Sequence, residues 1–207
     1  MISFNDDLVK YLQTSGALKT DRIIKSFKAV DRSDFVPNSL QSAAFADQAL
    51  PIGWGQTISQ PATVAFMLEL LQPNLGDKVL EIGFGSGYVA ALLSQIVGKT
   101  GLVVAVERIA ELGQQAYKNL TQYNFPQLRL VIANASKGIK QPAAYDKIII
   151  SAAASKMPAE VISQLTEGGK MVFPYGQDLQ EIILLEKVDN KIIKQSYPGF
   201  VFVPLVD

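Results

Sequence analysis

The chain has 207 residues, 48% of them hydrophobic, and its 19 basic residues balance its 19 acidic residues. A balanced charge does not favour nucleic acid or an anionic membrane as a partner. The sequence lacks cysteine and histidine, which excludes disulfides, thiolate nucleophiles and the commonest general base and metal ligand. We therefore expect one folded domain, no metal site, and a reaction that needs neither a thiol nor an imidazole.

The first seven residues are acidic and lack the basic-then-apolar pattern of a secretory signal. No apolar run reaches the length of about 18 residues that a membrane-spanning helix needs. We therefore expect a cytoplasmic protein with no membrane partner.

Helical spacing of apolar residues predicts two helices near the N-terminus, over residues 4–14 and 21–31. Thr20 or Asp21 could cap the second helix. Residues 1–50 are too few to form a core of their own, so we interpret them as a helical cap over the rest of the domain.

Residues 50–61 are rich in turn formers and lead into a predicted helix over residues 62–71. Pro61 occupies the place of a first helical residue, where its missing N–H is not needed. Ser59 is a candidate cap for the same helix, because a serine oxygen can accept a backbone N–H of the first turn.

The middle of the chain alternates short apolar runs with helical segments, a pattern typical of a parallel sheet covered on both faces. The predicted strands are residues 79–82, 102–107, 128–132, 147–151 and 170–174, and the predicted helices are residues 90–97, 109–123 and 159–165. Gly168 and Gly169 are expected to end the last helix. Residues 181–188 and 191–195 predict an antiparallel hairpin, and residues 201–203 are a candidate last strand.

The sequence thus predicts an α/β protein with a Rossmann-like, mostly parallel, doubly wound sheet and an antiparallel C-terminal hairpin. In a single domain of residues 1–207, residues 51–180 would form the core beneath the helical cap. Residues 181–207 would form the C-terminal antiparallel strands.

A glycine-rich turn follows the first predicted strand of the core. Glu81 lies at the end of that strand, and Gly83, Gly85 and Gly87 follow at every second position before a helix begins. Glycine reaches positive φ at low cost and has no Cβ to keep a ligand from the backbone. The strand, turn and helix place backbone N–H groups and a helix N-terminus in one crevice, which suits a nucleotide-like cofactor.

A dinucleotide fingerprint requires glycine at the first, third and sixth positions of this turn, but Tyr88 stands at the sixth. The spacing of Glu81 and the three glycines instead resembles motif I of the methyltransferases that use S-adenosyl-L-methionine (SAM). A second acidic residue is expected about 20 residues further on, at the end of the next strand, to hold the ribose hydroxyls. Glu107 supplies it.

Nearly the whole chain resembles the protein-L-isoaspartate O-methyltransferase family. The stretch Gly55-Gln56-Thr57-Ile58-Ser59-Gln60-Pro61 is the part of the resemblance most specific to this family. The other parts are Phe35-Val36-Pro37, Ala46-Asp47, Leu50-Pro51-Ile52-Gly53, residues 79–83 and 85–88, Tyr145-Asp146, Ala152-Ala153-Ala154, Gly168-Gly169 and Phe202-Val203-Pro204-Leu205.

The resemblance implies that the chain binds SAM, releases S-adenosyl-L-homocysteine and acts on isoaspartyl-containing proteins and peptides; we expect it to be a monomer. In the family, the α-carboxylate of an L-isoaspartyl residue attacks the methyl group of SAM. The methyl ester closes spontaneously to a succinimide, which partly reopens to normal aspartate. A carboxylate is already ionised at pH 7, so this transfer needs no general base. The protein must supply alignment of the reacting groups and exclusion of water.

The resemblance also implies which residues form the site. Ser59 falls on the family's active-site serine, whose hydroxyl could hydrogen-bond the substrate carboxylate. Glu107 would accept from both ribose hydroxyls. The implied cofactor-binding residues are Gln56, Thr57, Ile58, Glu81, Gly83, Phe84, Gly85, Ser86, Gly87, Glu107, Arg108, Asn134 and Ala135.

Two departures from the family pattern affect the expected cleft. Ala133-Asn134-Ala135 stands where the family usually has Gly-Asp-Gly, and Ala62 where an aromatic residue or histidine is common. Asn134 can accept from the adenine amine but lacks the charge of aspartate, and charge-assisted bonds are about twice as strong as neutral ones.

These departures leave two alternatives open, namely a SAM-dependent methyltransferase for another acceptor and a SAM-binding protein without turnover. A nucleic-acid methyltransferase is disfavoured, because the sequence shows no stripe rich in lysine and arginine.

Overall fold

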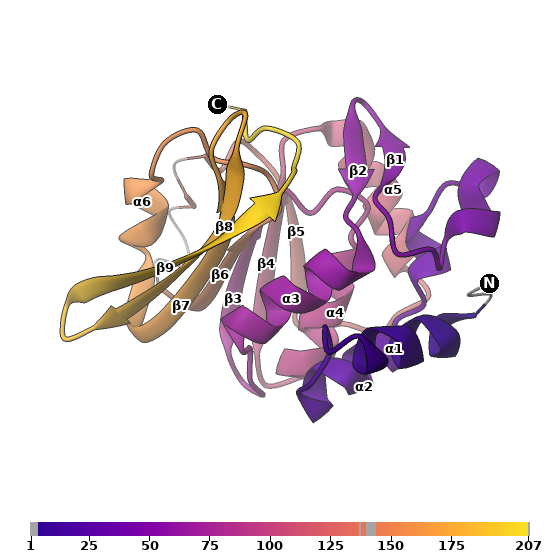
Figure 1. The fold of residues 1–207 in the computed structure, drawn as a ribbon, viewed down its shortest axis with the longest axis horizontal. Helices are drawn as coiled ribbons and strands as arrows, with labels where there is room; N and C mark the ends of the chain where they lie inside the picture. The colour runs from indigo at the N-terminus through magenta and orange to yellow at the C-terminus, as the bar shows by residue number, and fades with distance from the viewer. Residues whose placement is uncertain (1–3, 137, 140–143, 207) are drawn as a thin grey trace.

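A β-sheet runs through the middle of the molecule, with helices packed against it (Figure 1). The computed structural model describes residues 4–136, 138–139 and 144–206. The two ends of the predicted 1–207 domain, residues 1–3 and residue 207, lie outside the described part of the chain. Residues 1–3 also belong to the first seven residues, whose lack of a secretory signal pattern was noted above.

The described residues form a seven-stranded sheet in the order β5-β4-β3-β6-β7-β8-β9. Five neighbouring strands, β5 to β7 in that order, pair in parallel, whereas β8 and β9 join in antiparallel fashion. Their bounds are β3 Lys78–Ile82, β4 Leu102–Glu107, β5 Leu128–Ile132, β6 Tyr145–Ile150, β7 Leu165–Tyr175, β8 Gln180–Val188 and β9 Lys191–Phe200. The predicted mostly parallel sheet with an antiparallel C-terminal hairpin is confirmed.

The chain reverses direction in the sheet beside β3. It runs outward from β3 through β4 to β5, and then crosses back to place β6 on the other side of β3. In open α/β sheets, such a reversal leaves a crevice outside the carboxyl ends of the strands, where ligands bind.

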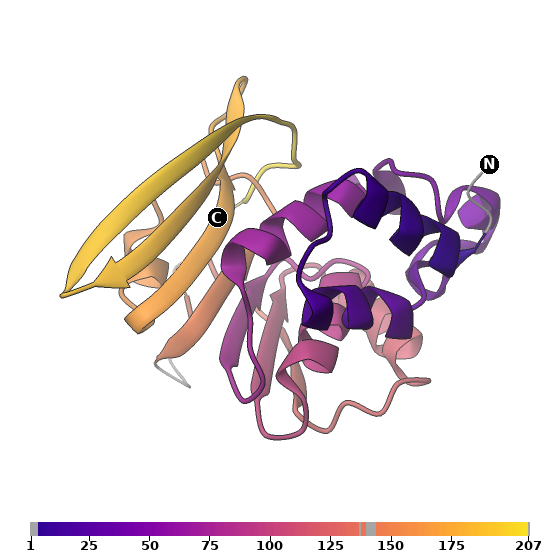
Figure 2. The same ribbon diagram turned by 60° about the horizontal axis from the view of Figure 1, so that its bottom comes forward.

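Alternating side chains of the strands divide the core between the two faces of the sheet. Val79 and Val103 pack with the helices α1 to α5, whereas Leu80 and Val104 face α6 and the segment after β5. Figures 1 and 2 show α1 to α4 gathered on one side. The α-helices are α1 Asn5–Thr14, α2 Asp21–Ala29, α3 Pro61–Leu71, α4 Tyr88–Val97, α5 Ala110–Leu120 and α6 Ala159–Ile162. None of the helices in the described residues is long and apolar enough to cross a bilayer.

The N-terminal segment packs over α3 and α4 as helices and turns. Two 3-10 helices, η1 (Arg32–Phe35) and η2 (Asn38–Ala43), follow α2, and then a hairpin of β1 (Leu50–Gly53) and β2 (Gln56–Ile58) leads into α3. Thr20 immediately precedes α2, but its hydroxyl donates to Glu69 (2.6 Å) and does not cap the helix. The hairpin was not predicted, because its two strands are very short and the segment is rich in turn-forming residues, which give no strand pattern in the sequence.

Two other local predictions are wrong. Gly168 and Gly169 do not end a helix but lie within β7, where the pairing register with β6 shifts and Gly168 takes φ +74°. The helix instead ends at Ile162. Residues 201–203 form no strand; the tail runs past the end of β6, where Ala153 N–H donates to the Val203 carbonyl (2.8 Å) and Leu205 N–H to the Ala153 carbonyl (2.8 Å).

Candidate active site

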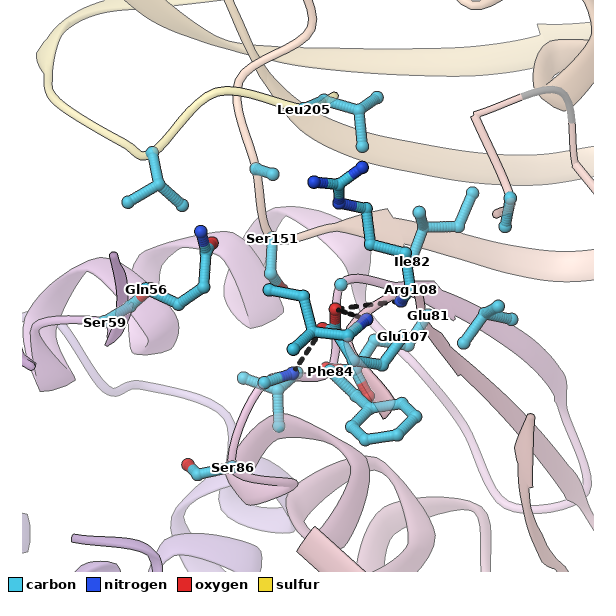
Figure 3. A pocket seen from close by; sticks show the side chains of 18 of the residues that line it. Gln56, Ser59, Glu81, Ile82, Phe84, Ser86, Glu107, Arg108, Ser151 and Leu205 are labelled. Carbon is cyan, nitrogen blue, oxygen red and sulfur yellow. Dashed lines mark hydrogen bonds between the residues drawn. The ribbon is translucent and has the colours of Figure 1, made fainter. Parts of the chain in front are cut away.

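A pocket lies at the carboxyl ends of β3, β4, β5 and β6 (Figure 3), and its space, with the open solvent at its mouth included, is about 870 Å³. It is lined by Gln56, Thr57, Ile58, Ser59, Val64, Glu81, Ile82, Gly83, Phe84, Gly85, Ser86, Tyr88, Val89, Val106, Glu107, Arg108, Ile109, Ala133, Asn134, Ala135, Ser136, Ser151, Ala152 and residues 203–206. All of the predicted site residues except Gly87 are among them. The pocket therefore collects side chains from segments that are far apart in the sequence.

The glycine turn between β3 and α4 has left-handed backbone at all three of its glycines. Gly83, Gly85 and Gly87 have φ values of +81°, +54° and +92°. A Cβ on Gly83 would meet nothing within 4 Å, so the backbone there faces open space. A Cβ on Gly87 would lie 3.1 Å from Leu120 Cδ1, so Gly87 packs against α5 and does not line the pocket. Its place is at the N-terminal boundary of α4.

Glu107, at the end of β4, organises the turn beside it. Its Oε2 accepts the Gly85 N–H (3.1 Å), and its Oε1 accepts the N–H groups of Arg108 (2.8 Å) and Ile109 (3.0 Å). These dashed bonds lie at the centre of Figure 3. Although Glu107 is 6% exposed, it faces the pocket, and a carboxylate held by three N–H groups has a fixed direction.

Glu81, at the end of the neighbouring strand β3, is in a different situation. Its side chain is fully buried, and neither carboxyl oxygen has a hydrogen-bond partner in the described chain. Burial, with a smaller contribution from the charge of Glu107, raises the pKa of Glu81 to about 8. A buried carboxyl without a partner is costly, and at the edge of a pocket it is well suited to a cationic or hydrogen-bonding ligand group.

Ser59 directly follows β2 of the β1–β2 hairpin and lies on another side of the same pocket (Figure 3). It does not cap α3, since Gln60 precedes the helix and no side chain caps it locally. Among the residues that the structure describes, the Ser59 hydroxyl has no hydrogen-bond partner, so it is available to a ligand.

The segment after β5 contributes Ala133, Asn134 and Ala135. Ala133 N–H donates to the Glu107 carbonyl (2.9 Å), which continues the ladder of β4 and β5 beyond the strand end. The Asn134 side chain is exposed, and its Oδ1 accepts the Ser136 N–H (2.9 Å). This oxygen is therefore used to fix the turn.

The wall formed by Ser151, Ala152 and the C-terminal residues 203–206 was not among the predicted site residues. Figure 3 shows Leu205 above Ser151, on the opposite side of the pocket from Ser86 of the glycine turn, with the Arg108 side chain extending toward Leu205. Two signals in the sequence could have found this wall. Residue 151 ends a predicted parallel strand, and the stretches 152–154 and 202–205 both belong to the family resemblance.

Two features together define a class of protein, the SAM-dependent methyltransferases with a Rossmann-like fold. They are the parallel sheet whose strand order reverses beside β3, and the glycine turn flanked by Glu81 of β3 and Glu107 of β4. Comparison with known proteins narrows the class. A family model described as protein-L-isoaspartate(D-aspartate) O-methyltransferase matches residues 3–207. The chain belongs to this family, which confirms the assignment made from its motifs.

Individual relatives agree with the family match. The chain is 42% identical over 199 residues to a protein-L-isoaspartate O-methyltransferase of Methanococcus aeolicus, covering 96% of this chain and 92% of the relative. It is 44% identical to protein-L-isoaspartate O-methyltransferase 1 of Archaeoglobus fulgidus, covering 90% and 86%.

The fold also matches a crystal structure from Plasmodium falciparum. That protein, assigned as a protein-L-isoaspartate O-methyltransferase, was solved in complex with S-adenosyl-L-homocysteine. The match has a TM-score of 0.89 at 22% identity and covers 99% of both chains. The structural similarity therefore extends over nearly the whole chain.

Proposed function

We propose that this chain transfers the methyl group of SAM to the α-carboxylate of L-isoaspartyl residues in damaged proteins and peptides. The observation that carries the proposal is that one pocket joins the glycine turn and both acidic strand ends to the family-specific stretch around Ser59. The first set of groups suits a nucleoside cofactor with an amino-acid end, and the second suits a carboxylate acceptor.

The residues present fit SAM by their chemistry. Gly83 leaves backbone exposed without a Cβ in the way, and Glu107 offers a carboxylate at the distance along the chain expected for ribose recognition. The Glu81 carboxyl has no hydrogen-bond partner among the described residues, and the ammonium group of the methionine end would provide one. The other predicted contacts, except Gly87, line the pocket and are part of this proposal: Gln56, Thr57, Ile58, Phe84, Gly85, Ser86, Arg108, Asn134 and Ala135.

The chain's own task in the transfer is alignment. Bound SAM supplies an electrophilic methyl group on a positively charged sulfur. The acceptor carboxylate is ionised at neutral pH and needs no base, which agrees with a chain that has neither histidine nor cysteine. The Ser59 hydroxyl, which has no hydrogen-bond partner among the described residues, would donate to one carboxylate oxygen and leave the other directed at the methyl carbon.

The proposed partners are isoaspartyl-containing proteins and peptides. We further propose that the protein is a monomer and that it acts in the cytoplasm. The balance of 19 basic and 19 acidic residues supports a protein or peptide partner more than a nucleic acid. Gel filtration with light scattering tests the oligomeric state.

Methyl-labelled SAM and a matched pair of peptides, one with L-isoaspartate and one with L-aspartate at the same position, test the proposed reaction. Base-labile label on the isoaspartyl peptide alone is the expected result. Equal label on both peptides, or none on either, would refute the proposed acceptor. If neither peptide is labelled and calorimetry shows that SAM binds, the chain is a methyltransferase for a different acceptor or a SAM-binding protein without turnover.

A further inference from the structure

A buried arginine lies behind the stretch that carries Ser59. Arg32, at the start of η1, is fully buried, and its guanidinium donates to three backbone carbonyls. These belong to Ala44, Gln48 (3.0 Å) and Ser59 (3.1 Å). One planar side chain therefore joins the segment after η2 to Ser59 at the edge of the pocket, and Ser59 lies 27 positions after Arg32 itself.

The buried charge of this arginine requires hydrogen-bond partners in fixed positions. Burial lowers the pKa of Arg32 to about 10, partly offset by the nearby Tyr88 and Asp47. The group therefore remains protonated at neutral pH. A buried charge is strongly destabilising unless it has hydrogen-bond partners. The Nε of Arg32 finds none in the described chain, so the three carbonyls must stay where Nη1 and Nη2 can reach them.

Asp47 holds the other end of the same stretch. Its Oδ1 accepts the Ala62 N–H (2.8 Å) at the first turn of α3, and its Oδ2 accepts the Gln60 side-chain amide (3.1 Å). Arg32 and Asp47 thus hold residues 59–62 from one side, through the carbonyl of the first residue and the N–H of the last.

These bonds leave Ser59 little freedom except at its hydroxyl. The residue before it, Ile58, is buried and pairs with Leu50 in the β1–β2 hairpin. The Ser59 carbonyl is bound by Arg32, so the backbone on both sides of its Cα is fixed. The direction of the Cα–Cβ bond, and with it the reach of the hydroxyl into the pocket, follows from this backbone.

We propose that Arg32, supported by Asp47, is a positioning residue for methyl transfer, holding the Ser59 hydroxyl toward the acceptor carboxylate by binding the Ser59 carbonyl from behind the pocket. This inference rests on the proposed function. Arg32 is not among the residues that line the pocket, so it would touch neither a cofactor nor an acceptor bound there. Its influence on the reaction passes through Ser59.

A double-mutant cycle of Arg32→Lys and Ser59→Ala tests the proposal. Lysine keeps the charge but cannot direct a planar set of donors at three carbonyls, so kcat/KM for the isoaspartyl peptide is expected to fall about tenfold to a hundredfold. SAM affinity, measured by calorimetry, is expected to stay within about twofold, because the cofactor residues are untouched. In the Ser59→Ala background, Arg32→Lys is expected to change kcat/KM by less than about threefold, because the hydroxyl it positions is absent.

Two controls separate positioning from loss of stability. Leu12→Ala leaves a cavity at a fully buried position of α1 and so destabilises the same N-terminal segment. It is expected to lower the melting temperature. Its kcat/KM, measured about 20 °C below that melting temperature, where a two-state domain is folded, is expected to stay at the wild-type value. If Arg32→Lys does not fold, the same cycle is made with Asp47→Asn, which retains the arginine and weakens the hold on residues 60–62.

The outcomes are distinct. A loss of activity on Arg32→Lys that is equal with and without the Ser59→Ala substitution, or wild-type kcat/KM in Arg32→Lys, would overturn the positioning role while the repair reaction stands. An unsubstituted protein that labels no isoaspartyl peptide would overturn the proposed function, and the positioning role with it.

Discussion

The Glu107 carboxylate accepts three backbone N–H groups, whereas the buried carboxyl of Glu81, at the end of the adjacent parallel strand, accepts none from the described chain. Glu107 is the last residue of β4 and Glu81 the last but one of β3, and the two strands pair in parallel. Their separate environments lead to different predictions, one for the stability of the free protein and one for cofactor binding.

The first prediction concerns pH. The folded protein holds Glu81 at a pKa of about 8, above its ordinary value of 4.5, so between these values the folded state binds more protons than the unfolded state. Stability from this group is therefore full below pH 4.5 and is lost as pH rises through 8. Glu81→Gln removes the titration, and we expect it to stabilise the SAM-free protein at pH 8 by a few kcal/mol, at about 1.4 kcal/mol per pKa unit, and to have little effect at pH 4.5.

Urea unfolding of the two proteins across this range measures the effect. Glu111→Gln, a change on the exposed first turn of α5, is the matched control and is expected to keep the wild-type pH profile. A Glu81→Gln variant whose stability runs parallel to the wild type at every pH would contradict the assigned titration.

The second prediction concerns Glu107. Glu107→Ala removes the proposed ribose acceptor and also the carboxylate that holds the Gly85, Arg108 and Ile109 N–H groups. We expect SAM affinity to fall at least tenfold, since hydrogen bonds to a charged group contribute about 1.5–3 kcal/mol each. Calorimetry is the measurement, with Glu111→Ala as control, and unchanged affinity would refute the ribose assignment.

The third prediction concerns Asn134. Its Oδ1 already accepts the Ser136 N–H, so a single amide oxygen has to serve both the turn and an adenine amine. Aspartate has two acceptor oxygens and a charge, and Asn134→Asp is expected to strengthen SAM binding by up to about tenfold. Asn134→Ser keeps a turn-fixing oxygen without the second acceptor and serves as the comparison. If aspartate brings no gain over asparagine, the adenine amine lies elsewhere.

The fourth prediction concerns Gly87 and uses Gly16 as its control. Both glycines have left-handed backbone, with φ of +92° and +77°, but a Cβ would meet nothing within 4 Å at Gly16 and would lie 3.1 Å from Leu120 at Gly87. Gly16→Ala is expected to cost about 1–2 kcal/mol from backbone strain alone. Gly87→Ala adds crowding against α5, for a total of about 2–4 kcal/mol. Equal losses in urea unfolding would mean that α5 gives way without cost.

Much of the sheet could be predicted because its signals are local. Strand β5 has the predicted bounds, and Glu81, Gly83 and Glu107 meet at the carboxyl ends of parallel strands as their spacing requires. The paired left-handed residues Asp189 and Asn190 form the expected turn between β8 and β9.

The failures share a cause, which is that a distant partner decides the role of the residue. Thr20 has the right type and position for a helix cap, but Glu69 takes its hydroxyl. Ser59 likewise stands near the start of α3, whose Ala62 N–H is instead capped by Asp47, 15 residues earlier in the chain. Nothing near Arg32 in the sequence reveals that its guanidinium reaches the Ser59 carbonyl.

Residues 203–206 form one wall of the pocket, so the order in which the chain is synthesised decides when the site is complete. A ribosome releases the glycine turn and the Ser59 stretch long before residues 203–206, which are held to Ala153 by two backbone bonds. Since domains form from the N-terminal side during synthesis, a nascent chain can fold its parallel strands while its pocket still lacks one wall. The complete site, and with it any tight binding of its ligands, forms only after residues 203–206 have left the ribosome.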